Sequence, residues 1–482
     1  MRKLLAALVA LLVFAPAAQA GGNHHRELRG YAHGTWQSFV AMTDKKSGLP
    51  ADVLNADGTT SVQTSTTNIG AYMWSAVAAR ELGFISKGEL TQRLTKTLRS
   101  LERMERHRPS GQFYNWYDHR TGEKLTVWPP TGQPRTPILS SVDNGWLAVG
   151  LKIVSNSVPA LRKRASKLYE SMDFGFYYRP DVNRILFHYE PDTGAAPCCY
   201  DTVVSESRIA TYIGIARGQM PPKTFYGTHR SWPDSCQHSW TETRPVGVTR
   251  RYFGVDVFEG ALPYAGMLVV PSWGGSMFEA LMPALFVPEE RWAPRSWGDN
   301  HPLTVKAQIH HGLEEARYGY WGFSPANVPE GGYAVYGVDG IGSDPNGNPS
   351  NNDRTLIDHG WPGCEGRDPQ PDPPPSAYTN GVVTPHAAFL ALRYAPRETL
   401  ENLRRLARDF PGLYGKWGFR DSVNVDTGTV SPAYLSLDQG MIMAALSNAL
   451  SDDLLRRAFA DRELERGLRH VIGIERFTTS KG

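Results

Sequence analysis

The chain has 482 residues, a formal net charge of +3 at pH 7 and 41% hydrophobic residues. This length accommodates one large domain or two to three of average size. Because the net charge is small and the lysines and arginines are spread along the chain, nothing indicates a polyanion-binding surface, and we expect no nucleic-acid partner.

The N-terminal residues have the organisation of a cleavable secretory signal. Arg2 and Lys3 precede an apolar run over residues 4–14, and the small-residue pattern Ala18-Gln19-Ala20 follows. A membrane anchor is less favoured, because a spanning helix needs roughly 20 apolar residues. We therefore expect a signal peptide over residues 1–20, a secreted or periplasmic mature chain, and no membrane association after cleavage.

An apolar period of 3.6 residues recurs along the chain and predicts about a dozen helices. They cover residues 27–42, 68–82, 87–105, 143–155, 159–171, 206–217, 277–286, 303–318, 385–393, 398–409, 434–447 and 452–469. Ser86 with Glu89 predicts a capping box, and Thr384 places a capping oxygen before Pro385. Without α/β alternation or a short repeat, an irregular bundle and an α/α toroid of six helical hairpins both remain possible.

Residues 340–380 are rich in proline, glycine and asparagine, so they predict a loop insertion rather than a helix or a central strand. No other segment has the composition of a domain boundary. We therefore expect residues 21–482 to form a single domain.

The cysteines are Cys198, Cys199, Cys236 and Cys364. In an oxidising compartment they can form two disulfides. A bridge between adjacent cysteines is sterically awkward, so we expect Cys198 and Cys199 to pair with Cys236 and Cys364, in an order that the spacing leaves open. The spacing also lacks the paired pattern of zinc sites, and we expect no metal and no cofactor.

Four acids lie at predicted helix ends beside aromatic, glycine-rich loops: Asp143, Glu206, Glu279 and Asp438. Glycoside cleavage needs a protonated carboxyl group and a carboxylate, so these residues are the candidates for that chemistry. Each also has a structural alternative. Asp143 suits a helix N-cap, and Glu206 suits a first turn with Arg208 close enough for an ion pair. Glu279 and Asp438 suit buried acids with satisfied partners.

Other reaction classes lack their motifs in this chain. There is no Gly-x-Ser-x-Gly nucleophile elbow and no phosphate-binding GxxxxGK[ST] loop. His310 and His311 are adjacent on a predicted helix and point in different directions, which disfavours a shared metal. Aromatic residues are concentrated in glycine-rich polar stretches, a distribution that suits stacking on sugar rings.

Several motifs occur in the order found in one known family. They include TTNIG at residues 66–70, FYNWYD at 113–118, SVDNG at 141–145, SESRI at 205–209, GSMFEALMP at 275–283, WGFSP at 321–325, VTPHA at 383–387 and LSLDQG at 435–440. With them, the chain resembles the glucoamylase-like domain of glycoside hydrolase family 144, the bacterial β-1,2-glucanases. It is more distantly similar to the transglycosylating domain of cyclic β-1,2-glucan synthases.

The resemblance implies an all-α (α/α)6 toroid with a cleft lined by Asp143, Glu206 and Glu279, and a polysaccharide or oligosaccharide substrate, β-1,2-glucan first. We predict Glu206 as the general acid, with Glu279 and Asp143 as base or sugar-binding groups. The other predicted substrate-binding residues are Asn68, Tyr114, Trp116, Trp273, Trp321, His386 and Asp438.

Three functional alternatives stay open. One is transglycosylation, another is hydrolysis of a different glycan such as an arabinan or a capsular polymer, and the third is glycan binding without catalysis. The nearer relatives imply inversion at the anomeric carbon and the synthase domain implies retention. We expect a monomer.

Overall fold

The computed structural model describes residues 15–232, 236, 241–343, 359–361 and 363–479, and side chains from residue 24 onward. Most of the predicted signal peptide and residues 344–358 of the predicted loop insertion lie outside the described residues. Within the described part of the chain, no helix is long and apolar enough to cross a membrane.

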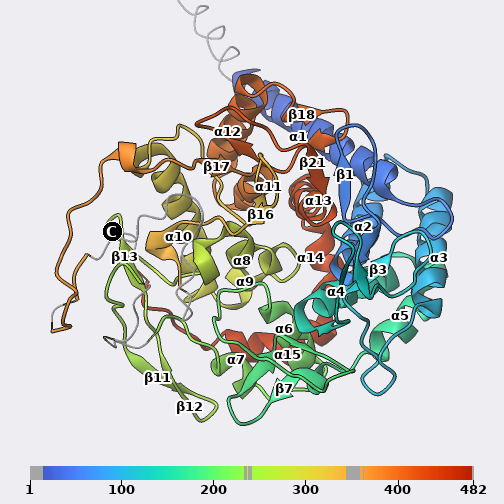
Figure 1. The fold of residues 1–482 in the computed structure, drawn as a ribbon, viewed down its shortest axis with the longest axis horizontal. Helices are drawn as coiled ribbons and strands as arrows, with labels where there is room; N and C mark the ends of the chain where they lie inside the picture. Colours follow the sequence, from blue (N-terminus) through green and yellow to red (C-terminus); the bar gives the residue numbers. More distant parts are fainter. Residues whose placement is uncertain (1–14, 233–235, 237–240, 344–358, 362, 480–482) are drawn as a thin grey trace, which may run out of the picture.

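Most of the α-helices form two sets around a common centre (Figure 1). The inner set comprises α2 (Thr66–Glu81), α4 (Ser141–Ser157), α6 (Arg208–Ala216), α8 (Met277–Leu281), α11 (Pro385–Leu390) and α13 (Ser436–Leu450). The outer set comprises α1 (Ala15–Met42), α3 (Lys87–Arg103), α5 (Arg162–Glu170), α10 (Trp297–His310), α12 (Pro396–Asp409) and α15 (Arg462–Ile472). The remaining α-helices of the described residues are α7 (Lys223–Tyr226), α9 (Glu289–Trp292) and α14 (Leu454–Phe459). In the inner set, α2 packs on α4 and α13, α4 packs on α6, and α11 packs on α8 and α13.

The two sets differ in their residue patterns because they are buried differently. Helix α2 is buried on almost every face, and it is rich in alanine and glycine where neighbouring helices approach closely. A Cβ added at Gly70 would meet the backbone oxygen of Trp146 in α4 at 2.4 Å. Helix α3, in contrast, buries Leu90, Leu94 and Leu98 along one face and exposes charged residues on the other. This amphipathic pattern is typical of a helix that covers a core from outside.

The strands are short and pair antiparallel. The pairs are β1 (Val53–Asn55) with β21 (Ala433–Leu435), β2 (Gln63–Ser65) with β3 (Trp116–Asp118), β4 (Val127–Trp128) with β5 (Gln133–Pro134), β6 (Leu139–Ser140) with β9 (His188–Tyr189), β11 (Thr249–Tyr252) with β12 (Val255–Phe258), β13 (Leu262–Tyr264) with β14 (Met267–Val269), β15 (Ala326–Asn327) with β16 (Tyr333–Ala334), β17 (Val382–Val383) with β20 (Val423–Asn424), and β18 (Tyr414–Gly415) with β19 (Gly418–Phe419). A three-stranded sheet has the order β10 (Cys198–Tyr200), β8 (Arg184–Leu186), β7 (Tyr178–Arg179).

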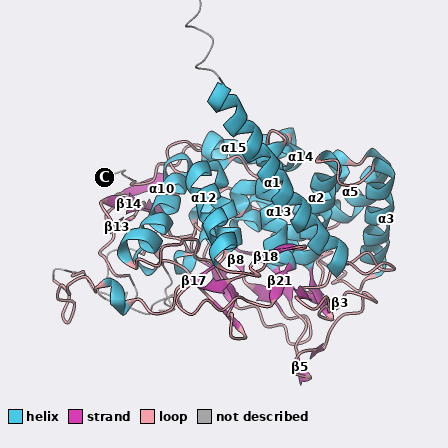
Figure 2. Cartoon of the chain, turned by 90° about the horizontal axis from the view of Figure 1, so that it is seen from above, coloured by secondary structure: helices cyan, strands magenta, loops and turns pink. Residues whose placement is uncertain are grey.

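Many of the strands gather at one end of the helices, where β3, β17 and β21 are labelled in Figure 2. Strands β2, β6, β17 and β21 end directly before or within two residues of the inner helices α2, α4, α11 and α13. These inner helices therefore begin at the same end of the molecule, and side chains of their first turns are brought together there.

The predicted helices are present, with ends that differ by a few residues and some interruptions. The segment 277–286 is divided because Pro283 lacks an amide hydrogen, and a 3₁₀ turn replaces the α-helix there. The segment 452–469 is two helices, because Asp461 caps the start of α15 by accepting from the amides of Glu463 and Leu464. The Ser86 half of the predicted capping box is confirmed, since its hydroxyl accepts from the Glu89 backbone amide at 3.1 Å, while the Glu89 carboxylate accepts from Arg93 at 2.8 Å.

Thr384 occupies the N-cap position of α11, directly before Pro385, as predicted, but the expected side-chain cap is absent. Its hydroxyl makes no capping bond to α11. Instead it donates to the backbone oxygen of Asp421 at 2.7 Å and lies 2.7 Å from His386 Nδ1. The long-range contact with the loop of Asp421 thus competes successfully with the local cap.

The predicted disulfide pairing is also wrong. Cys236 and Cys364 are bridged to each other with their Cα atoms 5.3 Å apart, a normal separation for a disulfide. This pairing leaves neither of them for Cys198 or Cys199, which are joined to each other. The Cys236–Cys364 bridge ties Cys364, in the predicted loop insertion, to Cys236.

Candidate active site

A cavity of about 300 Å³ lies beside the first turns of α6 and α8. Its lining residues are Phe187, Tyr200, Asp201, Thr202, Ser205, Glu206, Trp273 and Glu279. It combines aromatic rings with three carboxylic acids, Asp201, Glu206 and Glu279, as suits a site for a sugar. Three of the predicted site residues, Glu206, Glu279 and Trp273, are therefore brought together.

Glu206 lies in the turn that precedes α6 and is partly exposed. The indole nitrogen of Trp146 donates to its Oε2 at 2.5 Å, which fixes the orientation of the carboxyl group. Burial raises the pKa of Glu206 well above its usual value, and the negative charges of Glu279 and Asp143 raise it further. The carboxyl group of Glu206 therefore retains its proton to higher pH than an ordinary glutamic acid.

Glu279 lies in the first turn of α8 and is 8% exposed. Its Oε2 accepts from the backbone amide of Glu206 at 2.7 Å, so the two acids are in direct contact through the main chain. Burial raises the pKa of Glu279, although this amide and the Ser205 hydroxyl lower it. The helix itself is capped by Ser276, whose hydroxyl accepts from the Glu279 amide at 3.4 Å.

Arg208 does not form the ion pair with Glu206 that its position in the sequence allowed. Its Nε donates to Glu289 Oε1 at 2.7 Å, and both side chains are almost completely buried. Its Nη1 donates to the backbone oxygens of Ser205 at 2.8 Å and Glu279 at 2.9 Å. Arg208 thus links the turn of Glu206 to helix α8 through these backbone oxygens. Its guanidinium group makes its salt bridge with Glu289 rather than with Glu206 or Glu279.

Asp143 lies in the first turn of α4, but the N-cap is Ser140. Its Oδ1 accepts from the Thr67 hydroxyl at 2.6 Å and its Oδ2 from the Ser140 hydroxyl at 2.5 Å. With its amide group suitably oriented, Asn115 also donates to Oδ2 at 2.9 Å. Burial raises the pKa of Asp143 and the two hydroxyl hydrogen bonds oppose that shift.

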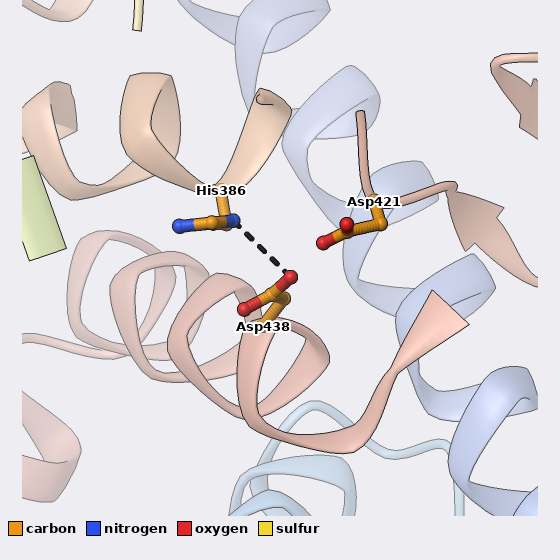
Figure 3. Close-up of side chains that lie close together, drawn as sticks. All are labelled: His386, Asp421 and Asp438. Atoms are coloured by element: carbon orange, nitrogen blue, oxygen red, sulfur yellow. Dashed lines mark ion pairs between the residues drawn. The ribbon is translucent and has the colours of Figure 1, made fainter. Parts of the chain in front are cut away.

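A second acidic group lies at the first turns of α11 and α13. Figure 3 shows His386, Asp421 and Asp438 turned toward one another. His386 Nδ1 lies 3.3 Å from Asp438 Oδ2, and all three side chains are almost completely buried. Burial raises the pKa of Asp438 to about 7. Burial and the charge of Asp438 raise the pKa of Asp421 well above its usual value.

This cluster has the residue types of a metal site, since one ligand atom from each residue lies within 4.8 Å of the others. The Thr384 hydroxyl gives its hydrogen to the Asp421 backbone oxygen, so it accepts from His386 Nδ1. A ring nitrogen that carries a proton cannot bind a metal ion, so Nε2 is the ring nitrogen of His386 that is left to accept a hydrogen bond or to act as a ligand. Burial lowers the pKa of His386 to about 4, which keeps the ring neutral at pH 7.

Two acids of this region, Asp421 and Asp52, were missed by the sequence analysis. Asp421 precedes β20 and Asp52 precedes β1, so neither acid carries the helix-start signal that marks the predicted ones. The side-chain amide of Asn68 donates to Asp52 Oδ1 at 2.8 Å, so the predicted binding residue Asn68 holds the carboxyl group of Asp52 in place. Burial raises the pKa of Asp52, and the charge of Asp143 adds to this effect.

The remaining predicted binding residues occupy different environments. Trp321, predicted to bind substrate, is 2% exposed and belongs to the hydrophobic core. Tyr114 is 7% exposed, and Lys124 Nζ lies 4.1 Å from the centre of its ring. Trp116 is half-buried and packs edge-to-face on Trp128. Only Trp273 among these aromatic residues lines the cavity of Glu206.

Two family profiles match the chain. Residues 249–463 match a family described as a putative glucoamylase. Residues 30–177 match a family described as a protein of unknown function, DUF3131.

The chain is also similar to curated proteins. It is 24% identical over 591 residues to the cyclic β-(1,2)-glucan synthase NdvB of Rhizobium meliloti (strain 1021), covering 91% of this chain and 18% of that protein. It is 21% identical over 420 residues to the exo β-1,2-glucooligosaccharide sophorohydrolase (non-reducing end) of Parabacteroides distasonis, covering 84% of this chain and 52% of that protein. The chain thus spans less than a fifth and about half of these relatives.

Among solved structures, the endo-β-1,2-glucanase from Chitinophaga pinensis, in complex with sophorotriose and glucose, has a TM-score of 0.65 and 18% identity to this chain. The alignment covers 93% of this chain and 98% of that one. At this identity the likeness shows that the two chains share a fold.

Proposed function

We propose that this chain is a glycoside hydrolase that cleaves β-1,2-glucan, with Glu206 as the general acid. The observation that carries the proposal is the position of Glu206 on a cavity of about 300 Å³, with its pKa raised by burial and by the charges of Glu279 and Asp143. The substrate is inferred from the relatives, whose names specify β-1,2-linked glucans.

Within this proposal, the raised pKa lets Glu206 keep its proton to a higher pH than an ordinary glutamic acid, ready for transfer to the glycosidic oxygen as the bond breaks. The Trp146 indole binds the Oε2 atom of Glu206 at 2.5 Å, which leaves Oε1 to face the substrate. Asp143 or Glu279 supplies the carboxylate that activates water or attacks the anomeric carbon. The other one of these two acids binds sugar hydroxyls.

The acidic cluster around α11 and α13 extends the proposed binding surface. Two of its atoms, His386 Nε2 and Asp421 Oδ1, lack hydrogen-bond partners among the described residues, whereas Asp438 Oδ2 lies 3.3 Å from His386 Nδ1. Buried polar atoms without partners are costly, so hydroxyl groups of a substrate are suitable partners for them. We include Asp421 with the predicted residues His386 and Asp438 as sugar-binding groups.

The proposal includes the wider organisation of the protein. The two sets of helices around a common centre suit an (α/α)6 toroid formed by residues 21–482 as a single domain. The chain is secreted or periplasmic after loss of residues 1–20 and acts as a monomer. The Cys236–Cys364 disulfide is consistent with an oxidising compartment.

The test is hydrolysis of linkage-defined glucans by the purified protein and by the E206Q variant. E206Q removes the transferable proton but keeps the shape of the side chain, so we expect turnover to fall by about 10²–10⁴-fold. Oligosaccharide binding should persist. E465Q is the matched control, because Glu465 lies on the outward face of α15 and pairs with Arg469 at 2.8 Å. Full activity of E206Q would exclude Glu206 as the acid.

Transglycosylation is the second candidate, favoured by the similarity to a cyclic glucan synthase over 91% of this chain. Product analysis separates the two reactions. Hydrolysis releases new reducing ends in proportion to bonds broken, whereas transglycosylation redistributes chain lengths or forms rings without that increase. NMR of the first-formed anomer decides between inversion and retention.

A further inference from the structure

The hairpin of β15 and β16 is attached at its base to the second acidic cluster. The backbone amide of Asn327 donates to Asp421 Oδ2 at 2.5 Å, and the Ser422 hydroxyl donates to the Asn327 oxygen at 2.5 Å. In the antiparallel pair, Tyr333 is directly opposite Asn327. Tyr333 therefore lies across one strand spacing, roughly 5 Å, from a residue that binds Asp421.

The chain that follows β16 is attached to the wall of the Glu206 cavity. The amide of Val338 donates to the Gly275 oxygen at 3.1 Å. A Cβ added at Gly337 would meet the Gly274 oxygen at 1.8 Å, so the two backbones are in close contact. Gly274 and Gly275 directly follow Trp273, which lines the cavity. The hairpin thus joins the two acidic groups, and β16 lies near the centre of the ring in Figure 1.

Tyr333 is unusual for an aromatic residue at such a position, because 59% of it is exposed. No other large hydrophobic residue in the described part of the chain is more exposed. Gly331 and Gly332, with φ of 125° and 94°, form the turn directly before it. These conformations are accessible to glycine and strained for other residues, so the turn that presents Tyr333 is specified by the sequence.

The surroundings of the Tyr333 hydroxyl connect it with both acidic groups. Loss of solvent around part of the side chain raises the pKa of the hydroxyl above its usual value, and the negative charges of Asp438, Asp421 and Glu206 add to this rise. The phenol therefore stays protonated as a hydrogen-bond donor, within electrostatic reach of both the proposed acid and the second acidic cluster.

We propose that Tyr333 is a substrate-binding residue, with its ring stacked on a glucosyl unit and its hydroxyl donating to a sugar oxygen between Glu206 and the Asp421–Asp438 pair. The inference rests on the proposed function and specifies how a glucan chain is held across the cleft. An exposed aromatic ring on a fixed hairpin supplies a large contact area at a low cost in conformational entropy.

The test separates stacking from hydrogen bonding with two variants, Y333A and Y333F. Binding of linear β-1,2-gluco-oligosaccharides is measured by calorimetry in the E206Q background, where turnover does not interfere. We expect Y333A to weaken binding by about 10-fold or more, since it removes a central aromatic contact. Y333F should weaken binding by about 2- to 10-fold, as expected for one hydrogen bond. In the active background, KM should rise in the same order.

The matched control is F253A, because Phe253 is 45% exposed on the β11–β12 hairpin, at the turn between the two strands. It should bind and hydrolyse as the parent does. Unchanged binding and KM in Y333A, with an active parent protein, would overturn the inference and leave the proposed function standing. A parent protein that neither binds nor hydrolyses β-1,2-glucan would overturn both. Melting temperatures of the variants equal to that of the parent ensure that lost binding is not lost folding.

Discussion

The buried ion pair between Arg208 and Glu289 supports the active-site turn, and its removal is predicted to destabilise the whole protein. Glu289 Oε1 accepts from Arg208 Nε and from the Tyr212 hydroxyl, both at 2.7 Å. Its Oε2 accepts from Arg208 Nη2 at 3.0 Å and lies 3.0 Å from His301 Nε2. R208M would leave this carboxylate buried without its cation, and E289Q would remove the negative charge instead.

The size of the effect follows from the pKa of Glu289. Burial opposes its ionisation, but the charge of Arg208 and the hydrogen bonds from His301 and Arg208 lower the pKa to about 2, from an ordinary value of 4.5. A difference of about 2.5 pKa units corresponds to about 3 kcal/mol. Because the folded-state pKa is the lower one, this stability is present above about pH 4.5 and is lost as the pH falls toward 2.

The free energy of unfolding, measured by urea denaturation at pH 7, tests this prediction. E289Q should lower the free energy of unfolding by about 3 kcal/mol. R208M should lower it by about 3–5 kcal/mol, because breaking a buried pair leaves an uncompensated charge. R208M should also lower kcat, since Arg208 holds the backbones of Ser205 and Glu279 together. The exposed pair of Arg469 and Glu465 supplies the control, and R469M should change stability by at most about 1 kcal/mol. Unfolding midpoints of R208M and E289Q equal to that of the parent would refute the reasoning.

Three further outcomes are expected. Since the pKa of Glu206 is raised and its protonated form is the active one, kcat/KM should fall on the alkaline side of the pH profile, at a pH well above that of an ordinary glutamic acid. Removing the Trp146 donor in W146F should raise that pKa further and move the alkaline limb to higher pH; a shift to lower pH would contradict the assignment. R230M should lower the free energy of unfolding by about 3–5 kcal/mol in denaturant titrations, because Arg230 is buried between Glu259 and Glu475; the exposed-site variant R251M should not.

The helices were predictable because both sets carry local signals. Outer helices such as α3 have an amphipathic period, and first turns such as that of α4 have polar caps. The strands contain two to four residues, too few for an alternating pattern, and they depend on partners far along the chain. Thr384 illustrates the limit, since its local capping signal gave way to a contact with Asp421, 37 residues away.

The candidate site was predictable where the acids stand at helix starts, as at Asp143, Glu206 and Glu279. Asp421 lies in a loop and was not, because only the folded chain brings it to His386. The aromatic motifs did not reveal which rings face the cleft, since Trp273 and Trp321 occur in similar glycine-rich contexts yet one lines the cavity and the other is in the core. Tyr333 was missed because its proposed role depends on the position of the β15–β16 hairpin in the folded chain.

Helix dipoles and burial act in opposite directions on the pKa values of the acids at this site. The start of a helix stabilises a negative charge and lowers the pKa of an acid. The pKa values of Glu206, Glu279 and Asp143 are nevertheless raised, because burial outweighs the dipole effect, and the charges of Glu279 and Asp143 raise the pKa of Glu206 further. The three are not equivalent: the carboxyl group of Asp143 accepts from two hydroxyls, whereas that of Glu206 accepts from one indole and faces two other acids. One proton shared within the group is therefore held by Glu206 while the negative charge stays on its neighbours, which is the division of roles that acid and carboxylate catalysis requires.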